Sequence, residues 1–283
     1  MRIVIIGSNG QLGMELSSEL ENHELVLATH NDIEIKSRTS VFSFIKDSKP
    51  DVVINTAAFH KVEECEKKPV TAFRANALGA KYLALACLMV DAVLLHISTD
   101  YVFGGVKGSP YNEDDLPNPL NVYGMTKLAG EHFIKSILKR YFIVRTSGLY
   151  GKHKCRAKCG NFVDRMISLA EKKEKIRVVD DEFLTPTYTY DLSKQIKKLI
   201  NTEFYGTYHI TNSGFCSWYE FAENIFKLIG LEVNLERAKS KEFASKVKRP
   251  LYSVLENKKL KSLNMDFMPM WDDALKRFLK GKN

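Results

Sequence analysis

The chain opens with an apolar run, a glycine-rich turn and an amphipathic pattern. Residues 2–6 are rich in β-branched side chains, which is typical of a strand buried on both faces. Leu12, Leu16 and Leu20 then recur every four residues and predict a helix with one apolar side. Further apolar runs at 24–28, 51–54, 92–97 and 141–147 alternate with helical stretches. This alternation predicts an α/β fold, a doubly wound parallel sheet with right-handed crossovers.

The glycines after the first strand indicate a nucleotide-binding turn. Their spacing is G-x-x-G-x-x-G, and they lie between a predicted strand and a predicted helix. In such a turn the first glycine permits the tight bend, the second lets the backbone approach a pyrophosphate, and the third allows close helix–strand packing. Glycine patterns alone are weak signals, but this one follows the first strand of the chain. The segment is Gly7-Ser8-Asn9-Gly10-Gln11-Leu12-Gly13.

The end of the second predicted strand bears on the cofactor. An acid commonly ends this strand in dinucleotide-binding folds and binds the ribose hydroxyls. Here the strand ends in Ala28-Thr29-His30, and Lys36 and Arg38 follow. Without an acid to repel a 2′-phosphate, we expect NADP(H) to be preferred over NAD(H), or mixed use of the two. The two cations are either surface residues or partners of that phosphate.

Polar residues of the fourth predicted strand and the next helix suggest acid–base chemistry. Residues 98–103, Ser-Thr-Asp-Tyr-Val-Phe, should lie at the carboxyl edge of the sheet, where open α/β sheets bind ligands. Tyr123 and Lys127 are four residues apart, so both project from one face of a helix. An adjacent cation lowers the pKa of a phenol, and Thr99 can hydrogen-bond the same substrate oxygen. The alternative is an ordinary solvated helix face.

Beyond residue 150 the predicted elements become shorter and the alternation is lost. Helices are predicted at 161–173 and 191–200, strands at 176–179 and 205–211, and a capping box at 217–220. We therefore expect two domains. A dinucleotide-binding Rossmann domain covers 1–150 and is rejoined by about 187–213, and a smaller C-terminal substrate-binding domain comprises 151–186 and 214–283.

Composition narrows the class of partner. The 283 residues include 42 Lys and Arg against 34 Asp and Glu, a net charge of +8. Because these cations are scattered among acids, they favour small anionic substrates and not nucleic acid. No apolar run approaches a membrane span and no leader signal is visible, so we expect a cytoplasmic protein without a membrane partner. Cys155, Cys159 and His153 form an incomplete zinc ligand set, so we expect free thiols and no metal.

Taken together, these motifs resemble the extended short-chain dehydrogenase/reductases and, among them, the dTDP-4-dehydrorhamnose reductases. The resemblance covers nearly the whole chain. Besides the glycine turn and the Thr-Asp-Tyr segment, it rests on 55–58, 119–127, 145–147, 160–163, 185–187, and Arg249-Pro250 with Ser253 and Leu255.

The resemblance implies roles for individual residues. Tyr123 would be the proton donor, Lys127 its pKa partner and ribose ligand, and Thr99 a ligand of the carbonyl oxygen. Cofactor-binding positions would be Gly7, Ser8, Asn9, Gly10, Gln11, Leu12, Gly13, Thr29, His30, Glu34, Ile35, Ala57, Ala58 and Phe59, with Tyr123 and Lys127. Substrate-binding positions would be Thr99, Asp100, Tyr101, Gly148, Asn161 and Arg249.

The implied reaction is the NAD(P)H-dependent reduction of dTDP-4-dehydro-6-deoxy-L-mannose to dTDP-L-rhamnose, the last step of nucleotide-sugar (dTDP-rhamnose) biosynthesis. Gly148 departs from the large residue expected there, so the sugar pocket is either roomier or filled by another side chain. Alternatives are another nucleotide-sugar epimerase, dehydratase or reductase of this architecture, or a non-catalytic regulatory subunit. The preferred cofactor, the preferred 4-keto sugar and a homodimer are left open.

Overall fold

The computed structural model describes residues 1–153, 160–172, 175–243 and 247–281. Its centre is a six-stranded sheet in which every neighbouring pair is parallel. The predicted α/β architecture is confirmed, and the strand order reverses between β1 and β3, where open sheets of this kind bind ligands. The strands, in spatial order, are β10 (Gly206–His209), β5 (Tyr141–Thr146), β4 (Val93–Thr99), β3 (Val52–Asn55), β1 (Arg2–Ile6) and β2 (Glu24–Ala28).

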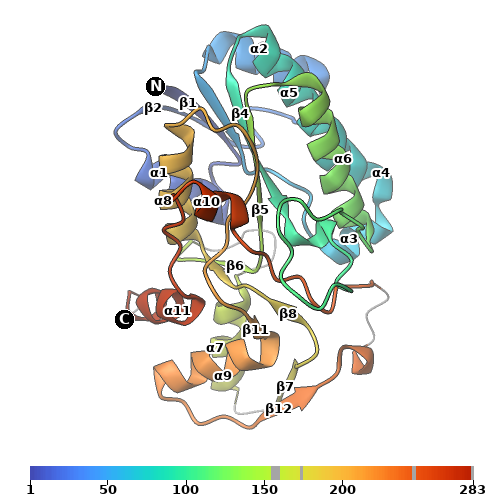
Figure 1. The fold of residues 1–283 in the computed structure, drawn as a ribbon, viewed down its shortest axis with the longest axis vertical. Helices are drawn as coiled ribbons and strands as arrows, with labels where there is room; N and C mark the ends of the chain where they lie inside the picture. Colours follow the sequence, from blue (N-terminus) through green and yellow to red (C-terminus); the bar gives the residue numbers. More distant parts are fainter. Residues whose placement is uncertain (154–159, 173–174, 244–246, 282–283) are drawn as a thin grey trace.

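Helices cover both faces of this sheet (Figure 1). One face carries α1 (Gln11–Glu19) and α8 (Thr189–Ile200), and the other carries α2 (Arg38–Ser48), α5 (Gly79–Met89) and α6 (Val122–Ile137). The leucine repeat that predicted α1 is buried, because Leu12, Leu16 and Leu20 belong to the apolar core on its side of the sheet. An apolar core lies on each face of the sheet. The packing of these two cores holds the strands, and with them the carboxyl edge, in place.

A long helical segment follows residue 68 and contains a change of pitch. It begins as α4 (Pro69–Phe73), passes through a π-helical turn η1 (Arg74–Leu78) and continues as α5. Pi-helical turns are rare in proteins, and those that occur are often found at functional sites. This one carries Asn76, which is 1% exposed and points toward the site described below.

The later part of the chain forms a third apolar core below the sheet in Figure 1. It is built from α7 (Phe162–Glu171), α9 (Trp218–Ile229) and α11 (Trp271–Lys280). The predicted strand at 176–179 forms as β7 (Ile176–Val179), but it pairs with β12 (Leu235–Ala238) and not with the main sheet. The predicted capping box that opens α9 is confirmed. The domain division at the residues given above stays a prediction.

In the described part of the chain, short strand pairs and a C-terminal strap, residues 247–255, complete the fold. β10 and α8 return the chain to the main sheet and to its covering layer of helices. None of the helices in the described ranges has the length and apolar character needed to cross a membrane. The remaining short elements are α3 (Val62–Lys67), η2 (Asp100–Val102), β6 (Leu149–Tyr150), β8 (Phe183–Leu184), β9 (Thr187–Tyr188), β11 (Cys216–Ser217), η3 (Ser240–Glu242) and α10 (Lys258–Ser262).

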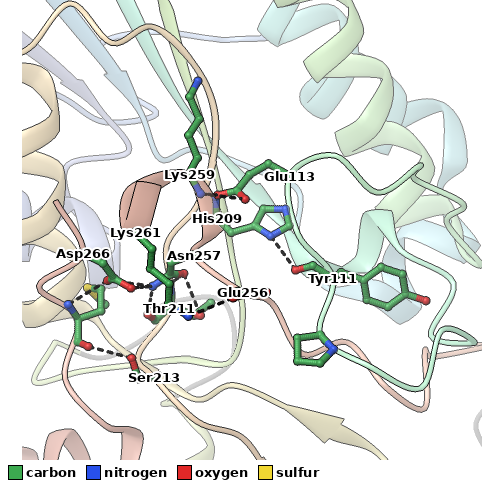
Figure 2. A network of polar contacts seen from close by, with 12 residues as sticks. Tyr111, Glu113, His209, Thr211, Ser213, Glu256, Asn257, Lys259, Lys261 and Asp266 are labelled. Carbon is green, nitrogen blue, oxygen red and sulfur yellow. Dashed lines mark hydrogen bonds and ion pairs between the residues drawn. The ribbon is translucent and has the colours of Figure 1, made fainter. Parts of the chain in front are cut away.

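The loop over 104–119 is fixed to the end of β10, as Figure 2 shows. The His209 ring lies 3.1 Å from the carbonyl oxygen of Tyr111, and the His209 amide donates to the Glu113 carboxylate at 3.0 Å. The backbone amide of Lys259, in the first turn of α10, donates to the same carboxylate. Burial raises the pKa of Glu113, whereas the hydrogen bonds it accepts act in the opposite direction. The loop is therefore held against the sheet by buried polar contacts.

Candidate active site

The glycine turn between β1 and α1 has the shape of a phosphate cradle. Gly7 adopts a left-handed φ of +78°, a conformation that favours glycine. A Cβ atom on Gly13 would lie 2.2 Å from the Gly7 carbonyl oxygen, so only glycine allows α1 to approach β1 this closely. The first turn of α1 has no side-chain cap and no acid. Its free amides and positive helix end fit the diphosphate of a dinucleotide.

The side chains of two residues in this turn, Ser8 and Gln11, hydrogen-bond neighbouring backbone groups. Ser8 is buried, and its hydroxyl donates to the Ala28 carbonyl at 3.2 Å. The Gln11 amide oxygen accepts from the backbone amides of Tyr150 and Gly151 at 3.3 and 3.1 Å. The turn is thereby tied to the ends of β2 and β6. Leu12 is a core residue, so its backbone and not its side chain is available to a cofactor.

The turn after β2 brings an acid close to the end of this strand, which the sequence pattern did not reveal. Asp32 folds back, so that its carboxylate accepts from the Thr29 amide at 2.8 Å and the Thr29 hydroxyl at 2.7 Å. These hydrogen bonds lower the pKa of Asp32. The strand end itself carries no acid, as the sequence indicates, but a turn brings the Asp32 carboxylate back to Thr29 beside it.

The cations near this strand end have other partners. Lys36 lies 3.3 Å from the Glu34 carboxylate, and the Arg38 guanidinium lies over the Phe42 ring at 5.1 Å. Ile35 is buried and packs in the core. Glu34 and Lys36 line a cavity of about 560 Å³ together with Ser37, Arg74, Leu78 and Tyr82. The contacts thus favour the surface role of Lys36 and Arg38.

The segment after β3 is held in place by Asn76 from the π-helical turn. The Asn76 amide accepts from the Phe59 amide at 2.8 Å and donates to the Phe59 carbonyl at 3.0 Å. It also donates to the Thr126 hydroxyl on α6 at 3.0 Å. Residues Ala57, Ala58 and Phe59 thus lie at the carboxyl edge next to the glycine turn. A Cβ on Gly7 would meet Thr56 and Ala57 within 3.2 Å, which confirms that the two loops are adjacent.

Tyr123 and Thr99 meet where α6 crosses the end of β4. Burial raises the pKa of Tyr123, and the neighbouring Thr99 hydroxyl acts in the opposite direction. The Tyr101 ring packs edge-on against Tyr123, with centroids 6.1 Å apart. A Cβ on Gly124 would lie 2.1 Å from the Tyr101 carbonyl oxygen, so glycine is required for this approach. The predicted helix face is therefore buried against the site and is not a solvated surface.

Lys127 is directed toward the interior of the sheet. Its ammonium nitrogen lies 2.5 Å from the Ile97 carbonyl oxygen and 2.9 Å from Nε2 of His96. Burial lowers the pKa of Lys127 to about 8, with Glu131 opposing. These contacts, and not the Tyr123 hydroxyl, are the polar partners that the described structure gives Lys127. The expected lowering of the Tyr123 pKa by Lys127 is not seen in this arrangement, because the lysine head lies against His96.

Asp100 joins three segments of the chain at the carboxyl edge of the sheet. It is 5% exposed, and its carboxylate accepts hydrogen bonds from Thr99 at 2.9 Å, Ser147 at 2.9 Å and Ser253 at 2.6 Å. Burial raises the pKa of Asp100, and the three hydroxyls oppose the shift. Ser253 comes from the C-terminal strap, which this contact joins to β4 and β5. Asp100 therefore fixes the walls of the site.

The space beside Gly148 is already filled, and the side chain of Asn161 already has hydrogen-bond partners. A Cβ on Gly148 would meet Leu184 at 2.7 Å and Pro186 at 3.1 Å, and its φ of +55° favours glycine. Of the two alternatives raised by this residue, the structure supports the filled one, because Leu184 takes the space. The Asn161 side chain caps α7 by accepting from the Asp164 amide, and it also donates to the Gly151 carbonyl at 3.1 Å.

Arg249 reaches the site from the C-terminal strap. It forms an ion pair with Glu63 on α3, and its side chain is 25% exposed. Burial acts to lower the pKa of Arg249, but the combined interactions with Tyr101, Glu63 and Glu182 outweigh it and raise the pKa. Arg249 is thus a partly exposed cation beside Tyr101, as a ligand for a phosphate group must be.

Comparison with known proteins gives the family. The family described as RmlD substrate binding domain matches residues 1–283. Spore coat polysaccharide biosynthesis protein SpsK of Bacillus subtilis is 39% identical, covering 100% of this chain and 98% of the relative. A dTDP-4-dehydrorhamnose reductase structure from Clostridium acetobutylicum is 41% identical with a TM-score of 0.95. The match covers 100% of this chain and 99% of that structure's chain. Another from Bacillus anthracis, in complex with NADP, has a TM-score of 0.95 and 40% identity, covering 99% of each chain. The chain belongs to the RmlD family.

Membership of the RmlD family confirms the resemblance inferred from the motifs and makes the chain an oxidoreductase on a Rossmann-like sheet. Cys155 and Cys159 lie outside the described residues. Within the described ranges, no group of three or more His, Cys, Asp or Glu side chains is placed to hold a metal ion. Cys65, Cys87 and Cys216 are buried free thiols.

The sequence interpretation missed several residues of the site, namely Asp32, Asn55, His96, Ser147 and Ser253. His96 stood inside an apolar run, where a histidine is a weak signal. Ser253 belongs to one of the motifs of the resemblance, but the motif does not indicate its contact with Asp100. Their partners lie 20 or more residues away, except for Asp32, and only the fold brings them together.

Proposed function

We propose that this RmlD family member reduces dTDP-4-dehydro-6-deoxy-L-mannose to dTDP-L-rhamnose with NADPH or NADH. The observation that carries the proposal is the meeting of Thr99, Tyr123 and Arg249 at one carboxyl edge, next to an uncapped glycine turn. The turn fits a dinucleotide diphosphate, the hydroxyls fit a carbonyl oxygen, and the guanidinium fits the sugar-bound diphosphate.

The residues divide the work as follows. A bound nicotinamide supplies the hydride for the C4 carbonyl of the sugar. Tyr123 holds the proton that the carbonyl oxygen receives, because burial raises its pKa and keeps it protonated. The Thr99 hydroxyl donates its only hydrogen to Asp100 at 2.9 Å in the structure, so it must turn from that carboxylate in order to hydrogen-bond the developing oxyanion. The resemblance implies that Lys127 would bind the nicotinamide ribose, for which its ammonium group would have to turn from the His96 and Ile97 contacts that it makes here. The burial of this region excludes water.

Several features support a dTDP-linked 4-keto sugar as the substrate. The segments 99–103, 119–127 and 249–255 resemble dTDP-4-dehydrorhamnose reductases, and curated relatives from Streptomyces griseus and Sinorhizobium fredii carry that name. The filled space at Gly148 removes the argument for a roomier sugar pocket. SpsK carries the name of a spore coat polysaccharide protein, so the sugar itself is the point to test.

The test is a panel of nucleotide-linked 4-keto sugars offered with each cofactor. Cofactor oxidation is followed by absorbance, and the product sugar is identified by mass and stereochemistry. We expect turnover with dTDP-4-dehydro-6-deoxy-L-mannose and dTDP-L-rhamnose as product. Turnover of a different keto sugar alone would reject the named substrate and leave the reductase class intact. Epimerisation without net cofactor oxidation would favour the epimerase alternative.

A further inference from the structure

His209 is a fully buried histidine that the proposed reaction does not use. It is the last residue of β10, and its exposed fraction is 0%. Its Nδ1 lies 3.1 Å from the carbonyl oxygen of Tyr111, in the loop over 104–119, and its Nε2 lies 3.5 Å from a terminal nitrogen of Arg145 on β5. Figure 2 shows the ring directed at the Tyr111 carbonyl. The histidine therefore joins the central sheet to this loop.

Both contacts of the ring have a fixed direction. The Tyr111 carbonyl can only accept, so Nδ1 of His209 must carry a proton, and the guanidinium can only donate, so Nε2 must offer a lone pair. Burial, and then the charge of Arg145, lower the pKa of His209 to about 3. The Tyr111 and Glu256 backbone and the Asp115 carboxylate oppose this shift, but the ring is neutral near pH 7. A neutral ring with its proton on Nδ1 meets both requirements.

Arg145 connects the histidine to the sheet edge that carries Thr99. Its guanidinium donates to the Glu131 carboxylate at 2.7 and 3.0 Å, and the Ser98 hydroxyl donates to the same carboxylate at 2.5 Å. Ser98 directly precedes Thr99 on β4, and Glu131 lies on α6. Arg145, Glu131 and Ser98 are 2%, 0% and 3% exposed. The Nε2 side of the ring is thus held by buried groups of the site itself.

Tyr111 connects the histidine to the C-terminal strap. Its amide donates to the Val254 carbonyl at 2.9 Å, and its carbonyl, the one that the ring contacts, accepts from the Glu256 amide at 2.8 Å. Nearer the start of the loop, a Cβ on Gly105 would lie 2.6 Å from the Cβ of Pro250, so the two backbones are close there as well. The loop therefore follows the strap from 250 to 256, and the place of the strap depends on where Tyr111 is held.

The strap carries two groups of the proposed substrate site. Arg249 lies in it, and the Ser253 hydroxyl donates to Asp100 at 2.6 Å. On the side away from Tyr111 the strap pairs with β8, where the Phe183 carbonyl accepts from the Ser253 amide at 2.9 Å. A strand that is paired on both sides moves only if one of its neighbours moves. A shift of the loop would therefore move the guanidinium relative to the sheet edge.

We propose that His209 is a positioning residue for substrate binding, in that its Nδ1–H fixes the Tyr111 carbonyl and thereby places the strap and Arg249 at the sheet edge. This inference rests on the proposed function, in which Arg249 binds the sugar-linked diphosphate. Glu113 supports the same connection, because its carboxylate accepts from the backbone amides of His209 at 3.0 Å and Lys259 at 3.2 Å. Because His209 acts through the strap, its loss should weaken binding of the sugar nucleotide without slowing the chemical step.

The first experiment is NMR of the full chain labelled with ¹⁵N at histidine, which reports which ring nitrogen carries the proton. The His209 signal is assigned from its loss in His209→Asn. We expect the neutral Nδ1–H form between about pH 6 and pH 8. The Nε2–H form, or a doubly protonated ring in this range, would overturn the proposal. No substrate is needed, so failure of the named substrate leaves this measurement unaffected.

The second experiment separates the two contacts of the ring. In His209→Asn the amide nitrogen takes about the place of Nδ1 and can still donate to Tyr111, whereas the longer side chain of His209→Gln reaches toward Arg145. We expect KM for the keto sugar to rise about fivefold in His209→Gln and to stay within about twofold of wild type in His209→Asn. The value of kcat and the KM for NADPH should be unchanged in both. Equal rises in KM, or a fall in kcat at unchanged KM, would refute the assigned role.

Binding of dTDP alone, measured by calorimetry on the same variants, gives a readout that needs no turnover. Its Kd should follow the same order, with His209→Gln the weaker binder. If dTDP binds as expected but the named sugar is not reduced, the named substrate fails and the positioning role stands. An unchanged dTDP affinity in His209→Gln would reject the positioning role, whatever sugar is reduced.

The control is a buried residue that holds a different part of the C-terminal segment. Gln195 is 1% exposed, donates to the Met265 carbonyl at 2.9 Å and accepts from the Phe267 amide at 3.1 Å. Gln195→Met should lower the melting temperature but leave KM for the sugar and the Kd of dTDP unchanged. If Gln195→Met raised both constants as much as His209→Gln, general loss of stability would explain the effect and the proposal would fall.

Discussion

The two walls of the site are built in different ways. The inner wall, residues 96–101 and 121–127, is mostly buried, apart from Met125, and is held by close backbone approach, with Gly124 directly against the Tyr101 carbonyl. The outer wall, residues 247–255, is joined to it by polar side chains. Ser253 reaches Asp100 at 2.6 Å, Asn121 reaches the Lys248 carbonyl at 3.0 Å, and Arg249 pairs with Glu63.

This difference assigns different tasks to the two walls. Dense packing holds the inner side chains to one geometry, as the alignment of a reacting carbonyl requires. The outer contacts are partly exposed and polar, so they can exchange partners when an anionic ligand binds. Changes to the inner wall should therefore alter kcat or stability, whereas changes to the outer wall should alter KM.

Tyr123→Phe should have the largest effect, because it removes only the proton that the carbonyl oxygen receives. We expect kcat to fall by roughly 10²–10⁴-fold while the cofactor still binds. Turnover and cofactor titration measure the two quantities. Tyr141→Phe, on β5, is the matched control. Wild-type turnover by Tyr123→Phe would remove this residue from the mechanism, and a lower melting temperature without loss of kcat would show a purely structural tyrosine.

Lys127→Met should raise the free energy of unfolding, because the buried lysine destabilises the folded inner wall. The Lys127 pKa falls from 10.5 to about 8 in the folded chain, so below pH 8 the folded state carries a buried charge that it disfavours. A shift of this size corresponds to about 3 kcal/mol. Between pH 8 and 10.5 the unfolded chain binds more protons than the folded one, so wild-type stability gains a rising contribution with pH.

The measurement is urea unfolding of both proteins at several pH values. Met lacks this titration, so the advantage of Lys127→Met over the wild type should be greatest below pH 8 and should shrink toward pH 10.5. Lys139→Met, at an exposed lysine just after the same helix, is the control. A difference that stays constant with pH would show that Lys127 titrates normally.

The sequence predicted the inner wall better than the outer one for physical reasons. Strand and helix periodicity, the glycine turn and the i, i+4 pair of Tyr123 and Lys127 depend on near neighbours, and all are found in the structure. Contacts such as Asp100 with Ser253, 153 residues apart, depend on how the strap folds back. The turn that returns Asp32 to Thr29, and the packing of Leu184 against Gly148, likewise have no periodic signal.

Arg249→Gln tests the outer wall. Loss of the guanidinium should raise KM for the dTDP-linked sugar by about tenfold, since charged hydrogen bonds contribute about 1.5–3 kcal/mol and glutamine recovers part of this. The value of kcat should change little. Arg237→Gln, which removes an exposed cation paired with Asp180, is the control. A fall in kcat at unchanged KM would show that the outer wall takes part in the chemistry and would remove the contrast between the walls.

Asp32→Asn should have the smallest effect, and it bears on the choice of cofactor. The Asp32 carboxylate lies against Thr29 at the end of β2, where the adenosine ribose binds in folds of this kind. Its charge repels a 2′-phosphate, whereas asparagine keeps an oxygen that can accept from Thr29. The ratio of kcat/KM for NADPH to that for NADH should therefore rise a few-fold, as initial rates with each cofactor would show. Asp47→Asn on α2 should leave the ratio unchanged. An unchanged ratio in Asp32→Asn would mean that the carboxylate does not face the ribose, and that the cofactor preference is set elsewhere at the sheet edge.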